Sequence, residues 1–539
     1  MDSKLITDKC EEHKINGMIQ FILKIKMTNN LQINNSIPSN FIPSNNCCEE
    51  ENKNNFNFDK FINPKLKLKY ILEYNWITFG YIINELGNGS SEFRKILENG
   101  GFVEKIEAID INDGKGFTSR LLRLIINIKY TNGINIKTKN FPNKFSLILK
   151  IFADERIEIL LEHFFGKERL EKVMLKFTEK LTIENNNNEE INKEIKDKKV
   201  NPVLKESMAS FTRMHQNECL FYKMMNNIEN PPLPIPKIYF TKNCRKEENE
   251  EDDKINKLGP QGVILMEDLT ENTHITPLTK GLNEIQIMEV VKYLAHLHAY
   301  LSLPKIKEKW QKDFVTIEEM WGQSVAEEFG SAMIEQIMEL DDDIVEPFKK
   351  IGNLVIKPEF VKWMKEKCEN DYGVPEILTH GDLWNNNLLW YNNNPNRLAA
   401  FIDWQLATIG NPMTDISRLM LATVEPDLRR KIEKEGKILE LYLNELNKKF
   451  VEQGMEKVKY GFEELQHVYN LAIISQAIGR VMEIPFFERG TPENDPEFKE
   501  KMECIKTRAK SSINDALKIL EMEAPEWLNK NEEKNGKNN

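Results

Sequence analysis

The sequence predicts an α+β protein whose N-terminal part is rich in strands and whose C-terminal part is mostly helical. Two apolar runs, RLLRLIINIKY (120–130) and FSLILKIFAD (145–154), are strand-like, and TNGIN provides a turn between them. After Asp415 nearly every segment has apolar residues at helical spacing, for example FEELQHVYNLAIISQAIGRVMEI. At 539 residues the chain is long enough for two lobes with separate cores.

The domain organisation follows from changes in composition along the chain. Asn- and Ser-rich sequence at the start is too polar to bury a core, and two further polar segments interrupt the predicted folded region. The predicted parts are a disordered extension (1–62), an N-lobe (63–268) with insertions near 183–199 and 242–257, a C-lobe (269–525) and a disordered tail (526–539).

Composition restricts the class of protein. The net charge of -11 disfavours general nucleic-acid binding, which needs basic surface. No run of about 18 apolar residues exists, so no membrane span is expected, and the first residues contain no apolar secretion signal. The seven cysteines are odd in number and lack C-x-x-C spacing, which argues against a disulfide framework or a zinc site. A reducing, cytoplasmic compartment is expected.

The most informative segment lies between Glu376 and Gly410. A short strand, EILT, runs into the polar loop HGDLWNNN, and the strands NLLWY and LAAFI follow with an Asn-rich turn between them. Such a hairpin brings Asp382, Asn387 and Asp403 to one edge. Phosphoryl transfer needs a carboxylate to orient the attacking hydroxyl and oxygen ligands for magnesium, and these residues supply both. Taken singly, the HGD turn could also be a helix cap, and Asp403 a strand-end residue satisfying backbone donors.

This segment resembles the catalytic segment of the aminoglycoside-phosphotransferase and choline-kinase superfamily, which has the pattern H-G-D-x-x-x-x-N followed by a strand ending in Asp. The matching residues are His380, Gly381, Asp382, Asn387 and Asp403. The segments FIDWQ and NPMTDISRL are most similar to the sequences of the CHK-kinase-like (ecdysteroid-kinase-like) branch. The resemblance covers roughly residues 75–520 and implies a bilobal protein-kinase-like fold that uses ATP and Mg²⁺.

The resemblance implies that Asp382 accepts or orients the proton of the substrate hydroxyl. It also implies that Asn387 and Asp403 hold the metal. Protein kinases have H-R-D and D-F-G at these points and an A-P-E segment later. Here Gly381 replaces the arginine and no A-P-E follows Asp403, so a small-molecule kinase is favoured.

The nucleotide site is expected in the N-lobe. DGKGF matches the family turn G-x-G-F-x-S through Gly114 and Gly116, which would offer backbone N–H groups to the phosphates; a plain hairpin turn is the alternative. Lys150 lies in an apolar strand, where an unpaired charge would be costly. The resemblance implies that Lys150 binds the nucleotide phosphates. The alternative is that Lys150 is a lysine at a strand edge without such a role.

Two further parts of the nucleotide site rest on the resemblance. QNECLFYKMM is similar to the E-x-x-F-Y helix of the family, which makes Glu218 the partner of Lys150 unless it faces solvent. Adenine would bind the backbone of the strand that connects the lobes, at Met266, Glu267 and Asp268.

The predicted function is ATP-dependent phosphorylation of a hydroxyl on a small organic molecule, for which the branch suggests a steroid-like or xenobiotic acceptor. The alternative is a degenerate kinase that binds nucleotide or a protein partner without turnover, although retention of Lys150, Asp382, Asn387 and Asp403 argues against it. Helices of the C-lobe would form the acceptor face. Aromatic side chains could line it or belong to the core: Trp321, Tyr469, Phe486 and Phe487.

Overall fold

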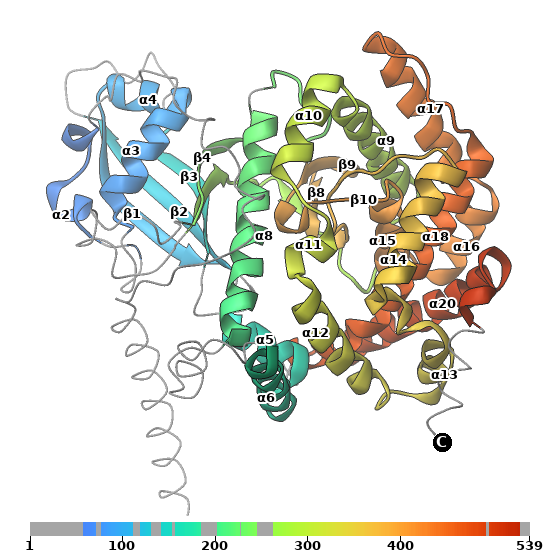
Figure 1. Cartoon of the computed structure of the whole chain (residues 1–539). Helices are drawn as coiled ribbons and strands as arrows, with labels where there is room; N and C mark the ends of the chain where they lie inside the picture. Colours follow the sequence, from blue (N-terminus) through green and yellow to red (C-terminus); the bar gives the residue numbers. More distant parts are fainter. Residues whose placement is uncertain are drawn as a thin grey trace, which may run out of the picture.

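The computed structural model describes residues 58–69, 71, 77–111, 119–130, 142–152, 157–184, 202–226, 228–244, 262–491 and 495–528. These residues form two lobes, one built on a sheet and one built of helices, with a long helix, α8 (Pro202–Asn226), between them (Figure 1). The predicted bilobal kinase-like fold is confirmed. Gly114 and Gly116, and most of both predicted insertions, lie outside the described residues.

The N-lobe contains a five-stranded sheet in the order β1-β2-β3-β5-β4. All neighbouring strands are antiparallel. The two runs predicted as strands are β2 and β3, and in the register of the sheet Lys150 of β3 lies opposite Leu121 of β2 and Ile264 of β5. The strands are β1 (Gly101–Asp110), β2 (Ser119–Tyr130), β3 (Lys144–Phe152), β4 (Ile238–Lys242) and β5 (Val263–Glu267).

Helices that the sequence reading missed complete the N-lobe core. α3 (Phe79–Gly89) and α4 (Ser91–Glu98) begin at Thr78 and Ser90, whose side chains accept hydrogen bonds from backbone N–H groups in the first turn. Their apolar residues share one buried cluster with β1–β5.

The same cluster corrects a predicted boundary. Phe58 and Ile62, which the sequence assigned to a disordered extension ending at residue 62, are 1% and 2% exposed in this core. They flank the short η1 (Asp59–Phe61), and α2 (Pro64–Lys67) follows. The folded part therefore includes residues from 58 onward, because these two apolar side chains are needed to fill the core.

A second correction concerns α5 (Ile157–Phe165) and α6 (Lys167–Glu184), which the sequence placed in a strand-rich N-lobe. Both lie beside the lower end of α8 and pack against the C-lobe helix α12 (Gln323–Ile337), and α5 also packs against α19 (Ile484–Gly490) (Figure 1). Arg489 of α19 fixes the contact by donating to the carbonyl oxygens of His163 and Phe164. This pair of helices therefore belongs to the C-lobe by packing.

The C-lobe is built around α18 (Phe462–Met482), which packs against α15 (Thr414–Thr423) and α20 (Phe498–Glu523). Two small sheets carry the catalytic hairpin: β6 (Thr273–His274) with β8 (Leu388–Tyr391) and β9 (Asn394–Phe401), and β7 (Ile377–Thr379) with β10 (Thr408–Gly410). The remaining helices are α9 (Glu284–Leu301), α10 (Pro304–Asp313), α11 (Ile317–Trp321), α13 (Asp342–Ile351), α14 (Pro358–Glu366), α16 (Pro426–Lys434) and α17 (Lys437–Glu452).

No helix within the described ranges combines the length and the hydrophobicity that a membrane span needs.

Candidate active site

The predicted hairpin places Asn387 and Asp403 at one edge, as the sequence indicated. Asn387 ends η8 (Asn385–Asn387), and Leu388 pairs with Phe401 across β8 and β9. The N–H of Ile402 donates to the carbonyl oxygen of Asn387 at 3.1 Å. Asp403 directly follows Ile402, the residue hydrogen-bonded to Asn387, so Asn387 and Asp403 lie at the same end of the hairpin.

Lys150 joins the two lobes at this edge. Its Nζ lies 2.6 Å from Oε2 of Glu218 on α8 and 2.6 Å from Oδ1 of Asp403. Lys150 is 6% exposed and Glu218 1%. Burial alone would lower the pKa of Lys150, but the carboxylates of Asp403 and Glu218 raise it above its ordinary value. Lys150 is therefore held as a cation between two acidic partners, and Glu218 faces inward and not toward solvent.

Asp382 is held in place by a cation that sequence reasoning did not assign to it. Arg418 of α15 donates from Nη2 to Oδ1 of Asp382, and Nδ2 of Asn387 lies 3.2 Å from Oδ2. Burial would raise the pKa of Asp382, but Arg418 and its other cationic neighbours lower it below the usual range. The carboxylate is thus ionised and fixed in orientation, which suits it to accept a hydrogen bond from a hydroxyl.

The loop around Asp382 is fixed by buried polar contacts. Asp415 accepts from the N–H of His380 at 2.7 Å and from that of Gly381 at 2.9 Å. His380 contacts the carbonyl oxygen of Ile402 through Nε2 at 3.0 Å. Gly381 has φ 77°, and a Cβ there would lie 2.2 Å from the carbonyl oxygen of Leu406. Only glycine fits this turn without displacing backbone.

An aromatic stack connects α8 to the catalytic hairpin. The rings of Phe221 and Trp404 stack with centroids 3.5 Å apart at 8°, and His380 lies 4.4 Å from Trp404. The stack follows Asp403, which has a left-handed backbone with φ 66°, the one positive φ of a non-glycine residue within the described part of the chain. Strain of this kind persists only where surrounding structure enforces it. Glu218 and Asp403 are thereby aligned on Lys150 from both sides.

The predicted adenine site lies at the end of β5, where several of its polar groups already have partners in the protein. Met266 is 7% exposed within the core, and Asp268 pairs with Nε of Arg123 at 2.6 Å. The N–H of Glu267 donates to the carbonyl oxygen of Lys237, and its Oε2 accepts from the N–H of Lys237. The polar side chains of the predicted adenine site are therefore engaged with the protein, and so is the N–H of Glu267.

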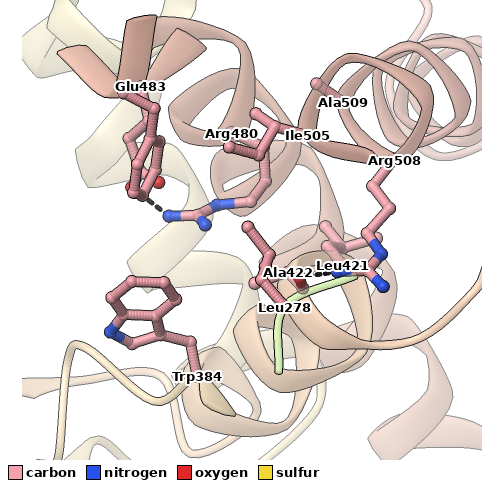
Figure 2. A pocket seen from close by; sticks show the side chains of 10 residues that line it. Leu278, Trp384, Leu421, Ala422, Arg480, Glu483, Ile505, Arg508 and Ala509 are labelled. Carbon is pink, nitrogen blue, oxygen red and sulfur yellow. Dashed lines mark hydrogen bonds and ion pairs between the residues drawn. The ribbon is translucent and has the colours of Figure 1, made fainter. Parts of the chain in front are cut away.

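A small cavity lies beside the catalytic loop on the side of the C-lobe helices. Figure 2 shows Trp384 of the loop below the guanidinium of Arg480, which comes from α18 and contacts Glu483. Glu483 also pairs with Arg418 at 3.2 Å, so the cavity connects to Asp382 through one ion-pair network. Sequence reasoning missed Arg480 and Arg508, because an arginine inside a helical pattern gives no sign of which helix it will face.

Of the aromatic residues predicted to line an acceptor pocket or the core, Phe487 lines this cavity. Tyr469 is 2% exposed and donates its hydroxyl to Oε1 of Glu433 at 2.9 Å, so it belongs to the core. Phe486 stacks on Phe164 of α5 with centroids 4.5 Å apart, and Trp321 packs edge-on against Phe211 of α8.

The fold and the site together define a two-lobed protein in which a buried lysine, paired with Glu218 and Asp403, joins the lobes. The chain belongs to the family DUF1679, described as "Uncharacterized oxidoreductase dhs-27", whose model matches residues 94–522.

Two curated relatives come from Caenorhabditis elegans. One is the "Uncharacterized oxidoreductase dhs-27", 24% identical over 233 residues, which cover 40% of this chain and 26% of that protein. The other is the "Uncharacterized kinase-like protein D1044.1", 25% identical over 231 residues, which cover 42% of this chain and 55% of that protein. The matches thus span about a quarter and about half of these relatives.

Solved structures show weak likeness. A Plasmodium vivax ethanolamine kinase is 13% identical with a TM-score of 0.38, covering 76% of this chain and 82% of that one. An aminoglycoside 2'-phosphotransferase-IIIa, in complex with GDP, is 11% identical with a TM-score of 0.34, covering 76% of this chain and 93% of that one. Likeness at this level carries no argument about what this chain binds.

The word oxidoreductase stands in the description of the family, whose model matches residues 94–522, and in the name of a relative of which the match covers 26%. Dinucleotide-binding oxidoreductase folds of the doubly wound type have a mostly parallel sheet. In the residues that the structure describes, the five-stranded sheet is antiparallel throughout. The sheet that the structure describes is therefore not of the doubly wound parallel type.

Proposed function

We propose that this protein is an ATP-dependent phosphotransferase that moves the γ-phosphoryl group of ATP to a hydroxyl of a small organic molecule. The observation that carries the proposal is the convergence of Lys150, Glu218 and Asp403, with Nζ of the lysine 2.6 Å from both carboxylates, at the edge that also holds Asn387. A lysine buried between a helix carboxylate and a strand-end carboxylate is the arrangement that positions nucleotide phosphates in kinases.

The residues present fit a magnesium ion. Asp403 offers a carboxylate whose side chain is 31% exposed. Because Nδ2 of Asn387 donates to Asp382, the Oδ1 of Asn387 is the atom it can offer to a ligand. Carboxylate and amide oxygens are the ligands that Mg²⁺ takes beside phosphates. Asn387 and Asp403 would hold the ion, which would supply charge neutralisation at the phosphates.

In the proposed reaction the acceptor oxygen forms a bond to the γ-phosphorus, and the bond from that phosphorus to the β–γ bridging oxygen breaks, which releases ADP. Asp382 orients the hydroxyl and receives its proton late in the transfer. The transition state of such reactions is loose, so positioning matters more than base strength. A carboxylate fixed by Arg418, with a low pKa, is consistent with that requirement.

The proposal includes the roles that the resemblance gave to the remaining residues. Gly114 and Gly116 would contact phosphates, and the backbone near Met266, Glu267 and Asp268 would contact adenine. We also place the activity in a reducing, cytoplasmic compartment, because the seven cysteines are odd in number and lack C-x-x-C spacing. The acceptor of the ecdysteroid-kinase-like branch, a steroid-like or xenobiotic alcohol, remains part of the hypothesis.

The test is incubation of the full chain with Mg-ATP and a panel of sterols, amino alcohols and a generic peptide, with phosphorylated product detected by mass spectrometry. Nucleotide binding is measured in parallel by calorimetry. Transfer to a small alcohol supports the proposal, and transfer to the peptide would make the protein a protein kinase. Binding of ATP without any transfer would favour the degenerate kinase.

A further inference from the structure

The cavity beside Trp384 lies on the acceptor side of Asp382. It has a volume of about 20 Å³, enough for one water molecule or an oxygen of similar size. The walls come from the catalytic loop, the loop after β6 and four helices, and none of the proposed nucleotide-site residues lines it. Its lining residues are Leu278, Trp384, Leu421, Ala422, Arg480, Glu483, Phe487, Ile505, Arg508 and Ala509.

Two buried arginines with incomplete hydrogen bonding lie in this wall. Arg480 is 8% exposed and Arg508 4%. Arg480 contacts Glu483, while Arg508 donates to the carbonyl oxygen of Ala422 at 3.0 Å and to Glu425 at 2.6 Å. The Nε of each arginine is buried, and neither has a hydrogen-bond partner in the part of the chain described by the structure. A buried donor left without a partner costs free energy that a ligand acceptor would recover.

Two arginines, Arg480 and Arg508, and one carboxylate, Glu483, are the charged residues that line the cavity. Burial and the neighbouring Arg418 lower the pKa of Arg480 to about 10, against the opposite effects of Glu483 and Asp382. Figure 2 shows the guanidinium of Arg480 reaching over Trp384, while Arg508 enters from α20 beside Ala422. An anion between these side chains would accept hydrogen bonds from the unpaired N–H groups.

We propose that this cavity binds an acidic group of the acceptor, so that the preferred substrate is a hydroxy acid with an apolar body. The inference rests on the proposed function, because the hydroxyl must reach Asp382. Leu278, Leu421 and Ile505 give the cavity apolar walls, and Phe487 packs edge-on to Trp384 with centroids 5.7 Å apart. A cationic group is disfavoured in the cavity because two of the three charged residues that line it are arginines, Arg480 and Arg508.

The terminal phosphate of ATP is the other source of an anion near Asp382. The position of the cavity favours the acceptor, since its walls are formed by α15, α18, α19 and α20 and not by β3, α8 or β5. Binding measured in the absence of nucleotide separates the two sources.

The experiment compares each acid with its methyl ester, using 4-(hydroxymethyl)benzoate and 12-hydroxydodecanoate. Binding to the full chain without nucleotide is measured by calorimetry, and phosphoryl transfer is then measured with Mg-ATP. We expect at least one acid to bind about tenfold to a hundredfold more tightly than its ester, the usual worth of a charge-assisted hydrogen bond. This comparison uses the wild-type protein and does not depend on a variant folding.

The variants Arg480→Gln and Arg508→Gln should remove most of the preference for acid over ester and leave affinity for ADP unchanged. Arg397→Gln is the matched control, because Arg397 is an exposed arginine of β9 whose guanidinium lies over the ring of Tyr391. Equal binding of acid and ester, or no binding of either, overturns the inference. If the acid preference depends on bound ATP and Arg480→Gln weakens ATP binding, the arginines bind the nucleotide and the inference is wrong. Tight acid binding without any transfer would overturn the proposed function and leave the anion site in place.

Discussion

At the scale of single residues, a substitution of Asp382, the partner of Arg418, tests whether this carboxylate acts in phosphoryl transfer or in nucleotide binding. Asp382→Asn keeps one acceptor oxygen, which can serve Arg418, and loses the carboxylate together with the hydrogen bond that its second oxygen accepts from Asn387. We expect transfer to fall by roughly 10²–10⁴-fold, the usual worth of a positioned acid or base. Affinity for Mg-ATP should change far less, because Asn387, Asp403 and Lys150 remain. Steady-state kinetics and calorimetry test this, and equal loss of both properties would make Asp382 a metal or structural residue.

Asp403 is expected to act on the metal. In Asp403→Asn, Lys150 keeps Glu218 as its partner, so the protein should fold, with a lower melting temperature because one ion-pair partner of a buried lysine is lost. Mg-ATP should bind more weakly, while binding of ATP in EDTA should change little. The measurement is the difference in affinity with and without Mg²⁺. An unaltered difference would remove Asp403 from the metal site.

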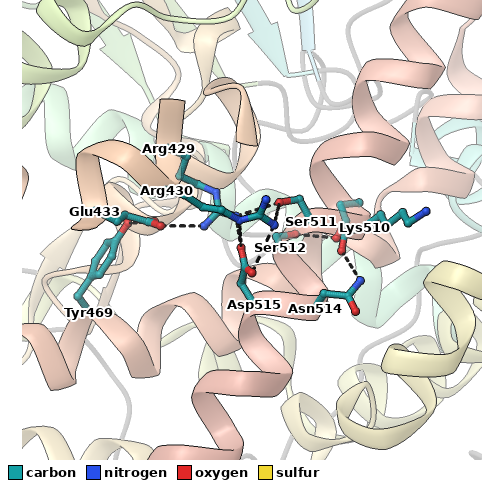
Figure 3. A network of polar contacts seen from close by, with 10 residues as sticks. Arg429, Arg430, Glu433, Tyr469, Lys510, Ser511, Ser512, Asn514 and Asp515 are labelled. Atoms are coloured by element: carbon teal, nitrogen blue, oxygen red, sulfur yellow. Dashed lines mark hydrogen bonds and ion pairs between the residues drawn. The ribbon is translucent and has the colours of Figure 1, made fainter. Parts of the chain in front are cut away.

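At the scale of elements, polar networks join helices that are distant in sequence. Figure 3 shows Arg429 of α16 and Asp515 of α20 in contact, with Glu433 and Tyr469 completing the network. Arg429 is 2% exposed and its Nη2 lies 2.5 Å from Asp515. The network fixes α16 and α18 against α20.

The network predicts a stability difference between two aspartates, Asp515 of α20 and Asp343 of α13, which pairs with α20. Asp515→Ala leaves a buried guanidinium with one carboxylate fewer and should lower the free energy of unfolding by about 1–3 kcal/mol. Asp343→Ala removes the exposed partner of Lys510 on the same helix and should cost less than about 1 kcal/mol. Urea unfolding of both variants provides the comparison, and equal effects would show that burial of Arg429 does not control the cost.

The contact of α9 with α17 predicts a pH dependence. His298 is 1% exposed, and its Nδ1 lies 2.8 Å from the hydroxyl of Tyr442. Burial lowers its pKa from 6.5 to about 3. A depressed pKa means that the unfolded chain takes up the proton first, so stability is full above pH 6.5 and is lost as the pH falls toward 3.

The slope should be up to about 1.4 kcal/mol per pH unit within that window. His298→Gln should show a shallower loss of unfolding free energy between pH 7 and pH 5, measured by denaturant titration. Burial also lowers the pKa of His215, to about 4, so His215 contributes to the pH dependence of stability in both the wild type and the variant. Parallel pH curves for wild type and variant would contradict a neutral buried His298.

At the scale of the whole molecule, the position of the folded boundary is testable by truncation. Removing residues 1–57 should leave the melting temperature and ATP binding nearly unchanged, because that sequence lacks a core-forming pattern. Removing residues 1–62 also takes away Phe58 and Ile62, which are buried in the N-lobe core, and should lower the melting temperature by several degrees. Differential scanning calorimetry compares the two, and an equal loss from both would show that the first 57 residues contribute to stability.

The sequence by itself determined the strands, helices and hairpin whose formation depends on the local pattern of apolar and polar residues. Apolar runs predicted β2 and β3, helical spacing predicted α18, and the spacing of HGDLWNNN to FID predicted the hairpin that carries Asn387 and Asp403. These features are readable because strand and helix periods are set by backbone geometry over a few residues. The same reading missed α3 and α4, since short helices between strands give weak periodic signals.

The tertiary structure decided which side chains from distant elements meet. Arg418 reaches Asp382 across 36 positions of sequence, Lys150 reaches Asp403 across 253, and Arg480 and Arg508 face one cavity from different helices. The placement of α5 and α6 on the C-lobe is likewise a result of packing against α12 and α19. Sequence spacing fixes the face of one helix that a residue occupies, but the partner of that face depends on how helices cross and rotate against one another, which only the packed core determines.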